Sequence, residues 1–164
     1  MRALVIHESL TGNTRAAARL IVAELQREGW EASECSSRQV DLGALQQADV
    51  VVVGTWVDGL VLFGQRPGGA GKLARLPLLG GKPTYVYVTY AIDPGRTLDK
   101  LTAEITERRG DVQGGMVIKR GRLEEGSAEF ARRVIEASAD LAAAELDRAD
   151  LDPADRADAE PAEA

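Results

Sequence analysis

The sequence has one cysteine and one histidine, Cys35 and His7. A single cysteine forms no disulfide within the chain, and neither residue has the companions that a metal site needs. No apolar run approaches the roughly 18 residues of a membrane-spanning helix, and the apolar start of the chain is too short for a secretion signal. We therefore expect a cytoplasmic protein with no structural metal and no membrane contact.

Neither sign of charge is in large excess over most of the chain. The formal net charge is −6, but residues 147–164 hold seven of the 26 acids and only two of the 20 bases. The first 146 residues are therefore nearly neutral, with a net charge of −1. Their basic residues form no stripe interleaved with aromatic side chains, so no nucleic-acid partner is expected.

Residues 147–164 are rich in alanine, aspartate and proline and poor in large apolar side chains. Such a segment buries too little apolar surface to offset the entropy that it would lose on ordering. The remaining length suits one core. We expect one domain over residues 1–146 and an acidic, disordered tail over residues 147–164.

Five short apolar runs are spaced along this domain: Ala3–Ile6, Trp30–Cys35, Val50–Val53, Tyr85–Val88 and Gly115–Ile118. The first, third and fourth are rich in β-branched or aromatic residues at successive positions, which is typical of strands buried on both faces. The second alternates with charged residues, as an edge strand does. The runs predict five strands.

Helical patterns separate these runs. Apolar residues recur at helical spacing before Gly29, before Gly110 and near the end of the domain, and shorter patterns cover residues 42–46 and 71–76. Strands that alternate with helices predict right-handed crossovers and a parallel sheet. The expected fold class is α/β, with a doubly wound sheet of five parallel strands and helices on both faces.

A loop rich in hydroxyl and amide groups joins the first strand to the first helix and reads Ser9, Leu10, Thr11, Gly12, Asn13 and Thr14. Backbone N–H groups, the positive end of a helix and small polar side chains meet there, which predicts an anion site. The loop has no lysine or arginine, so we expect neutral dipoles to bind a phosphate. The alternative is an ordinary helix start capped by Thr11 or Asn13.

This loop resembles the phosphate loop of the flavodoxin family, S/T-x-T-G-x-T, in the same position after the first strand. The resemblance implies FMN as the cofactor, with its phosphate held by these six residues. It also implies a single flavodoxin-like domain with strand order 2-1-3-4-5 and the flavin at the point where that order reverses.

A second segment, Gly54–Gly59, follows the third predicted strand and resembles a flavin loop of the family. The resemblance implies that Trp56 stacks on the isoalloxazine ring; otherwise Trp56 is a partly buried core residue. The family also has a peptide here that reorients on reduction to hydrogen-bond flavin N5, which implies such a role for the Asp58–Gly59 bond. The cofactor residues expected in this segment are Thr55, Trp56, Val57, Asp58 and Gly59.

A third segment follows the fourth predicted strand and resembles the family's other flavin loop. The resemblance implies cofactor contacts from Tyr90, Ala91 and Gly95, with Tyr90 over the opposite ring face. Ile92 is an alternative for that face, and Tyr90 is otherwise a packing residue at the strand end. We expect no cation near the ring, so a negatively charged reduced flavin should be disfavoured.

The segment Gly68–Lys72 resembles at first a nucleotide-triphosphate loop. Arg66 stands where that loop has its first glycine, and Leu73 stands where it has a hydroxyl residue. We therefore assign no nucleotide to this segment.

The resemblance as a whole implies an FMN-dependent carrier that passes single electrons between redox protein partners, a reductase and an acceptor. Such a carrier has no catalytic residue of its own. An NAD(P)H-dependent quinone or flavin reductase of the same fold is the alternative, although no dinucleotide-binding residues are identifiable. A binding module without flavin is a third hypothesis, which the intact loop from Ser9 to Thr14 argues against.

Overall fold

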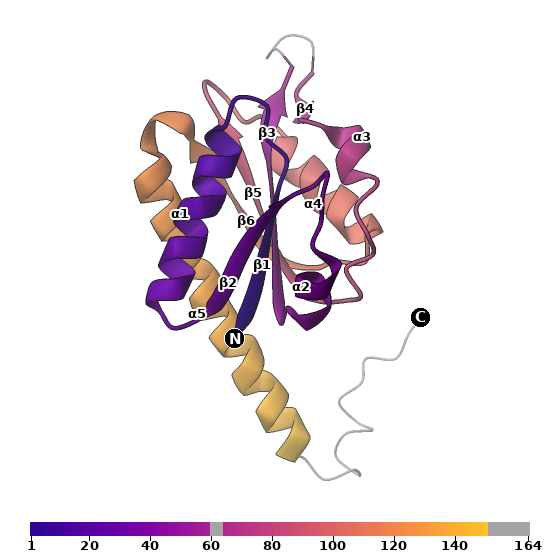
Figure 1. The fold of residues 1–164 in the computed structure, drawn as a ribbon, viewed down its shortest axis with the longest axis vertical. Helices are drawn as coiled ribbons and strands as arrows, with labels where there is room; N and C mark the ends of the chain where they lie inside the picture. The colour runs from indigo at the N-terminus through magenta and orange to yellow at the C-terminus, as the bar shows by residue number, and fades with distance from the viewer. Residues whose placement is uncertain (60–63, 151–164) are drawn as a thin grey trace.

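Strands and helices alternate along the chain in the computed structural model, which describes residues 1–59 and 64–150 (Figure 1). The strands are β1 (Arg2–His7), β2 (Glu31–Ser36), β3 (Val50–Asp58), β4 (Arg66–Pro67), β5 (Pro83–Tyr90) and β6 (Asp111–Lys119). The helices are α1 (Asn13–Arg27), α2 (Leu42–Gln47), α3 (Ala70–Leu73), α4 (Thr97–Glu107) and α5 (Leu123–Asp150), with a 3-10 turn, η2 (Arg120–Arg122), before α5.

Five strands form a parallel sheet in the order β2-β1-β3-β5-β6. These are the five predicted strands in the predicted order, so the α/β fold class is confirmed. The two-residue strand β4 is an addition that the sequence pattern does not predict. It pairs antiparallel with the end of β3, where Val57 lies opposite Pro67 and Asp58 lies opposite Arg66.

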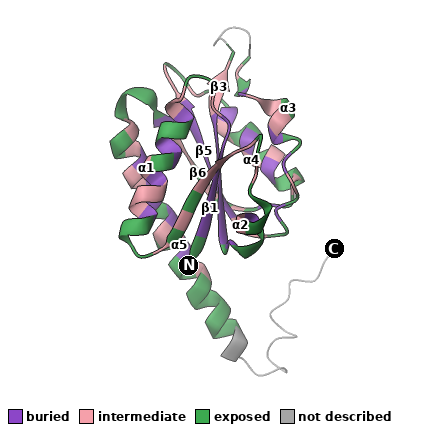
Figure 2. Ribbon diagram, in the orientation of Figure 1, coloured by how far each residue is buried: buried purple, intermediate pink, exposed green. Residues whose placement is uncertain are grey.

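Helices cover both faces of the sheet, with α1 and α5 on one face and α2, α3 and α4 on the other (Figure 1). Val5 and Val52 pack in the core under α1 and α5, whereas their neighbours Leu4 and Val51 pack in the core on the opposite face. Successive side chains of a strand point to opposite faces, so a strand between two helical layers must be apolar at every position. The central strands are accordingly buried (Figure 2).

The central strands extend further than their apolar runs predict. β3 continues to Asp58 and β5 continues to Tyr90. Trp56 still pairs with Thr89 in the parallel ladder, and β4 supplies partners for Val57 and Asp58. The prediction of a loop over Gly54–Gly59 is therefore wrong except at its last residue, because backbone pairing continues after the run of valines ends.

The helix α5 extends to Asp150, four residues into the segment predicted as a disordered tail. Its final part projects beyond the sheet, and residues 142–148 are exposed (Figures 1 and 2). The rest of that predicted tail, residues 151–164, lies outside the described residues. Among the helices within 1–59 and 64–150, none has the length and apolar character that crossing a membrane requires.

Candidate functional site

The carboxyl ends of β1, β3 and β5 lie side by side, because these strands are neighbours in the sheet. Three segments meet there: residues Ser9–Thr14, which we call the phosphate loop, the end of β3 with Trp56, and the end of β5 with Tyr90. The order of the strands reverses at this point, where open α/β sheets characteristically bind ligands. The topology therefore brings the three predicted segments to one edge.

The phosphate loop leads directly into α1. Gly12 precedes the helix with φ of 93°, and no side chain caps the first-turn N–H groups. A cap by Thr11 or Asn13 is therefore not observed. Glycine enters this left-handed conformation at little cost, so Gly12 turns the chain into the helix and leaves its N–H groups without a capping side chain. Such groups favour an anion.

The hydroxyl groups of the phosphate loop have different surroundings. Gly12 N–H donates to Ser9 Oγ at 3.2 Å, and Asn13 Nδ2 donates to Thr11 Oγ1 at 3.2 Å. Thr14 is buried instead, and its hydroxyl lies 2.8 Å from that of Thr89 in β5. The structure thus leaves Ser9 and Thr11 nearer to solvent, while Thr14 ties α1 to the sheet.

A cavity of about 190 Å³ opens between the three segments. Its walls come from the phosphate loop, both central strand ends and the turn after β6, and its lining residues are Thr11, Asn13, Trp56, Val57, Thr89, Tyr90, Ala91 and Arg120. An aromatic side chain from β3 and one from β5 contribute to the same cavity. This arrangement suits a planar, largely apolar group attached to a phosphate.

Trp56 owes its place to the turn after β4. Gly68 N–H donates to the Trp56 carbonyl at 2.7 Å, and the Thr55 hydroxyl donates to the Gly68 carbonyl at 2.6 Å. A Cβ at Gly68 would overlap the indole ring. The absence of a side chain at Gly68 therefore lets the indole pack against the turn while it also lines the cavity.

A model of the flavodoxin domain matches residues 4–94, more than half of the chain. The chain belongs to the flavodoxin family. No curated protein sequence matches it. The match covers the phosphate loop and the ends of β3 and β5, which are the segments that the sequence resemblance singled out.

Solved flavodoxins share the fold of this flavodoxin-family chain. A cysteine-to-serine mutant of flavodoxin from Pseudomonas aeruginosa superposes with a TM-score of 0.63 at 17% identity, over 84% of this chain and 98% of that one. For the two-electron reduced Megasphaera elsdenii flavodoxin the values are 0.60 and 18%, over 79% and 98% of the two chains. For the Streptococcus pneumonia TIGR4 flavodoxin they are 0.58 and 22%, over 81% and 99%.

Arg120 is a cavity residue that the sequence analysis missed. It is the first residue of η2, directly after β6, and it lines the cavity with Trp56 and Tyr90. The wall of this cavity therefore contains a cation, which the sequence did not lead us to expect. The available signal was its position, because a residue that follows a strand of this sheet reaches the carboxyl edge.

Some cofactor residues predicted in the second and third segments lie outside the lining of this cavity: Thr55, Asp58, Gly59 and Gly95. Asp58 Oδ2 accepts from Arg66 Nε at 3.2 Å. Gly59 already has φ of 99°, and a Cβ there would lie 2.5 Å from the Gly64 carbonyl oxygen. The cofactor roles of these residues, including the reorienting peptide at Asp58–Gly59, stay predictions.

A second cavity, of about 330 Å³, lies on the other side of the phosphate loop and is lined by His7, Ser9, Leu10, Gly12, Arg15, Ser36 and Arg38. At its base, His7 Nε2 and Glu34 Oε2 are 2.6 Å apart, and Arg19 Nε donates to Glu34 Oε1 at 3.2 Å. Burial acts to raise the pKa of Glu34, but these two hydrogen bonds and the electrostatic attraction of His7 and Arg19 together outweigh it and lower the pKa below its ordinary value. Leu10 and Ser9 thus face a different space from Thr11 and Asn13.

Proposed function

We propose that this chain binds FMN at the carboxyl edge of its sheet and carries single electrons between two redox protein partners, a reductase and an acceptor. Flavodoxins are FMN-binding flavoproteins that transfer electrons to redox partners. The observation that carries the proposal is the cavity shared by the phosphate loop, Trp56 and Tyr90. The location of the protein in the cytoplasm stays a prediction from the sequence.

The phosphate loop offers a phosphate neutral donors, and Arg15 and Arg38 line the cavity on one side of it. Gly12 leaves the first N–H groups of α1 without a side-chain cap, and Thr11 has an exposed hydroxyl nearby. Each hydrogen bond from a neutral donor to an anion contributes more than a neutral pair, and the helix terminus adds a favourable field. We assign the phosphate of FMN to Ser9, Leu10, Thr11, Gly12, Asn13 and Thr14.

The aromatic walls fit the flavin ring. Trp56 packs against Gly68, and Tyr90 at the end of β5 and the following Ala91 line the cavity opposite β3. Bound FMN supplies the electron-transfer chemistry, while the protein supplies orientation and tuning of the potential. In this proposal Trp56 and Tyr90 exclude water from the ring, and the remaining contacts come from Thr55, Val57, Asp58, Gly59 and Gly95.

An NAD(P)H-dependent quinone or flavin reductase is the second candidate, and Arg120 favours it. A guanidinium in the cavity stabilises negative charge there, either on a reduced flavin or on an anionic reactant. In a carrier of single electrons the same charge would act only on the potential of the flavin, whereas in a reductase it would also bind the anionic reactant. The two candidates share the cofactor and differ in what the cavity accepts next to it.

The absorption spectrum of the purified protein is the first test. A flavin spectrum that survives gel filtration supports FMN binding. Titration of the apoprotein with FMN and with riboflavin then measures how much the phosphate contributes to the binding free energy. Thr11→Val should lower the affinity for FMN about five- to tenfold and the affinity for riboflavin little, because the phosphate loses a hydroxyl donor. Thr106→Val, at an exposed site on α4, is the matched control.

Three outcomes would contradict the proposal or its leading form. An equal loss of affinity for FMN and riboflavin in Thr11→Val would exclude a role of Thr11 in binding the phosphate. A purified protein without any bound flavin that also fails to bind added FMN would support the hypothesis of a binding module without flavin. Rapid turnover with NADH or NADPH and a quinone favours the reductase over the carrier. Slow turnover together with fast exchange of electrons with a protein partner favours the carrier.

A further inference from the structure

Glu8 directly precedes the phosphate loop, yet it is buried, with 1% of the residue exposed. Lys72 Nζ donates to its Oε1 at 2.5 Å, the Ser37 hydroxyl donates to its Oε2, and an Arg38 nitrogen lies 3.7 Å from its Oε1. A buried carboxylate needs such partners because desolvation disfavours its charge. Its partners come from α3 and from the turn after β2, so the carboxylate joins three distant parts of the chain.

The charge of Glu8 is maintained despite this burial. Burial acts to raise its pKa, but hydrogen bonds from Lys72 and Ser37, with the charges of Lys72 and Arg38, outweigh it and lower the pKa below its ordinary value. Glu8 and Lys72 therefore form an ion pair at neutral pH. Neither side chain lines the cavity between Trp56 and Tyr90.

A short, closely packed segment connects this ion pair to Trp56. Gly69 lies against Glu8, since a Cβ at Gly69 would come within 2.6 Å of Glu8 Cγ. The Gly69 carbonyl accepts from Lys72 N–H at 2.7 Å. The preceding residue, Gly68, is hydrogen-bonded to the Trp56 backbone and packs on its indole. The segment Gly68–Lys72 thus contacts Glu8 at one end and Trp56 at the other.

We propose that the Glu8–Lys72 ion pair is a positioning device that holds the Trp56 indole at a set place relative to the phosphate loop. Glu8 is covalently continuous with Ser9, and Lys72 holds the turn on which the indole rests. The phosphate loop and the aromatic wall then behave as one rigid unit. The segment that resembles a nucleotide loop thereby acquires a role without a nucleotide. The flavin consequences of this inference rest on the proposed function, whereas the placement of Trp56 does not.

The test uses Trp56 as its own reporter in the apoprotein. The chain has two tryptophans, so Trp30→Phe leaves Trp56 as the single emitter. In this background, Glu8→Gln and Lys72→Met should each shift the emission to longer wavelength and increase quenching by acrylamide, because the indole leaves Gly68. Both variants should also lower the affinity for riboflavin about two- to tenfold, which is the range expected for the loss of one aromatic contact.

The signs of the two effects separate positioning from direct electrostatics. Glu8→Gln removes a negative charge near the phosphate loop and Lys72→Met removes a positive one, so a field effect on FMN affinity or on the flavin potential has opposite signs in the two variants. A positioning effect has the same sign in both. Lys72→Arg keeps the cation and should restore much of the Trp56 signal.

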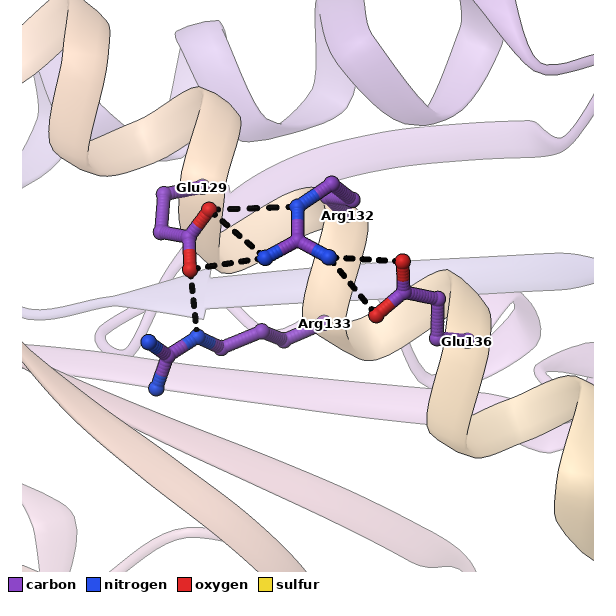
Figure 3. A network of polar contacts seen from close by, with 4 residues as sticks. All are labelled: Glu129, Arg132, Arg133 and Glu136. Atoms are coloured by element: carbon purple, nitrogen blue, oxygen red, sulfur yellow. Dashed lines mark hydrogen bonds and ion pairs between the residues drawn. The ribbon is translucent and has the colours of Figure 1, made fainter.

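A matched control is available on the far side of the molecule. Glu129 on α5 accepts hydrogen bonds from Arg132 and Arg133, and Arg132 also donates to Glu136 (Figure 3). Glu129→Gln removes one carboxylate from that exposed network and should leave Trp56 emission unchanged. It controls for the general loss of an ion pair.

Unchanged emission and quenching of Trp56 in Lys72→Met, with the far-ultraviolet circular dichroism spectrum retained, would overturn the proposal. Opposite shifts of affinity in the two variants with an unmoved Trp56 would do the same. Should Glu8→Gln fail to fold, Lys72→Met remains, since its side chain is 38% exposed. A failure of the wild-type protein to bind FMN contradicts the proposed function alone, because the fluorescence test needs no flavin.

Discussion

Arg120 is the residue that most changes the expected chemistry of the site. Its guanidinium places a positive charge beside the cavity that Trp56 and Tyr90 line. If the flavin ring occupies this cavity as proposed, the charge stabilises its reduced, anionic form relative to the oxidised, neutral one. Its exposure to solvent weakens the interaction and makes it sensitive to salt.

We predict that Arg120→Gln makes the midpoint potential of the bound flavin more negative, by roughly 20–40 mV for a one-electron step. The affinity for oxidised FMN should change little. Potentiometric titration at low salt measures the shift, which should shrink at high salt. Arg122→Gln is the control, because it removes the same charge from the same turn but outside the cavity lining. Equal shifts in both variants would contradict a local role of Arg120.

Thr14 joins the phosphate loop to the sheet through its side chain and its backbone. Its hydroxyl contacts that of Thr89, which also donates to the Thr55 carbonyl at 3.4 Å, and Tyr87 OH donates to the Thr14 carbonyl at 2.9 Å. The sequence resemblance assigns this hydroxyl to the phosphate. The structure gives it a partner within the protein.

We expect Thr14→Val to lower the free energy of unfolding by about 1–3 kcal/mol, because Thr89 loses a buried hydrogen-bond partner. Chemical denaturation of the apoprotein measures this effect. Titration with FMN and riboflavin then shows whether the hydroxyl also serves the phosphate, as the resemblance implies. An apoprotein of unchanged stability would show that the contact with Thr89 contributes nothing.

Glu8 gives the protein a specific dependence on acid. Its pKa is lowered in the folded state, so the unfolded chain takes up the proton first as the pH falls. The stabilisation is present above the ordinary glutamate pKa of about 4.3 and is lost below it. Urea denaturation between pH 7 and pH 3 should show a smaller decrease for Glu8→Gln than for the wild type. Glu124→Gln, at an exposed position of α5, is the control and should lose as much stability as the wild type. The expectation is contradicted if the curve of Glu8→Gln runs parallel to the curves of the wild type and this control.

At the scale of elements, the small strand β4 has an influence beyond its length. It pairs with the end of β3 and leads into the turn at Gly68, which supports Trp56. Two residues of strand are too few for an apolar pattern, so the pairing depends on what lies opposite. The aromatic wall of the site therefore depends on an element without a sequence signature.

We predict that Gly68→Ala displaces Trp56 and destabilises the protein by about 1–3 kcal/mol, since the new methyl group would overlap the indole. Riboflavin affinity should fall with it. The matched substitution, Gly71→Ala in α3, meets nothing within 4 Å and should be neutral or slightly stabilising. Denaturation curves and flavin titrations of both variants test this. Similar behaviour of the two variants would contradict the role of Gly68.

At the scale of the whole molecule, α5 has two parts with different roles. Phe130 and Val134 pack in the core beside α1, whereas residues 142–148 are exposed and extend past the sheet (Figure 2). An exposed helical end buries little apolar surface and so contributes little to the stability of the domain.

A chain that ends at Glu145 should therefore keep its thermal midpoint and its affinity for flavin. Differential scanning calorimetry and flavin titration of the shortened and full-length chains measure both. A fall of several degrees in the midpoint would show that residues 146–164 stabilise the domain.

The sequence by itself determined the strands and the layers of the fold, whereas the order of the strands was implied by the resemblance to the flavodoxin family. Runs such as Val50–Val53 are apolar at successive positions because both faces of a central strand meet helices, and this pattern is local. The motif from Ser9 to Thr14 lies between a strand and a helix, so its position at the carboxyl edge followed from chain order alone. The family match over residues 4–94 agrees with that prediction.

Only the tertiary structure decided which side chains share a space. Arg120 reaches the cavity because β6 lies beside β5, Glu8 is charged and buried because Lys72 comes to it from 64 residues away, and Thr14 faces Thr89 across 75 residues. These pairings depend on the register of parallel strands and on the path of a turn, which composition and periodicity do not encode. The polar contacts that tune the site therefore became visible only when the chain was folded.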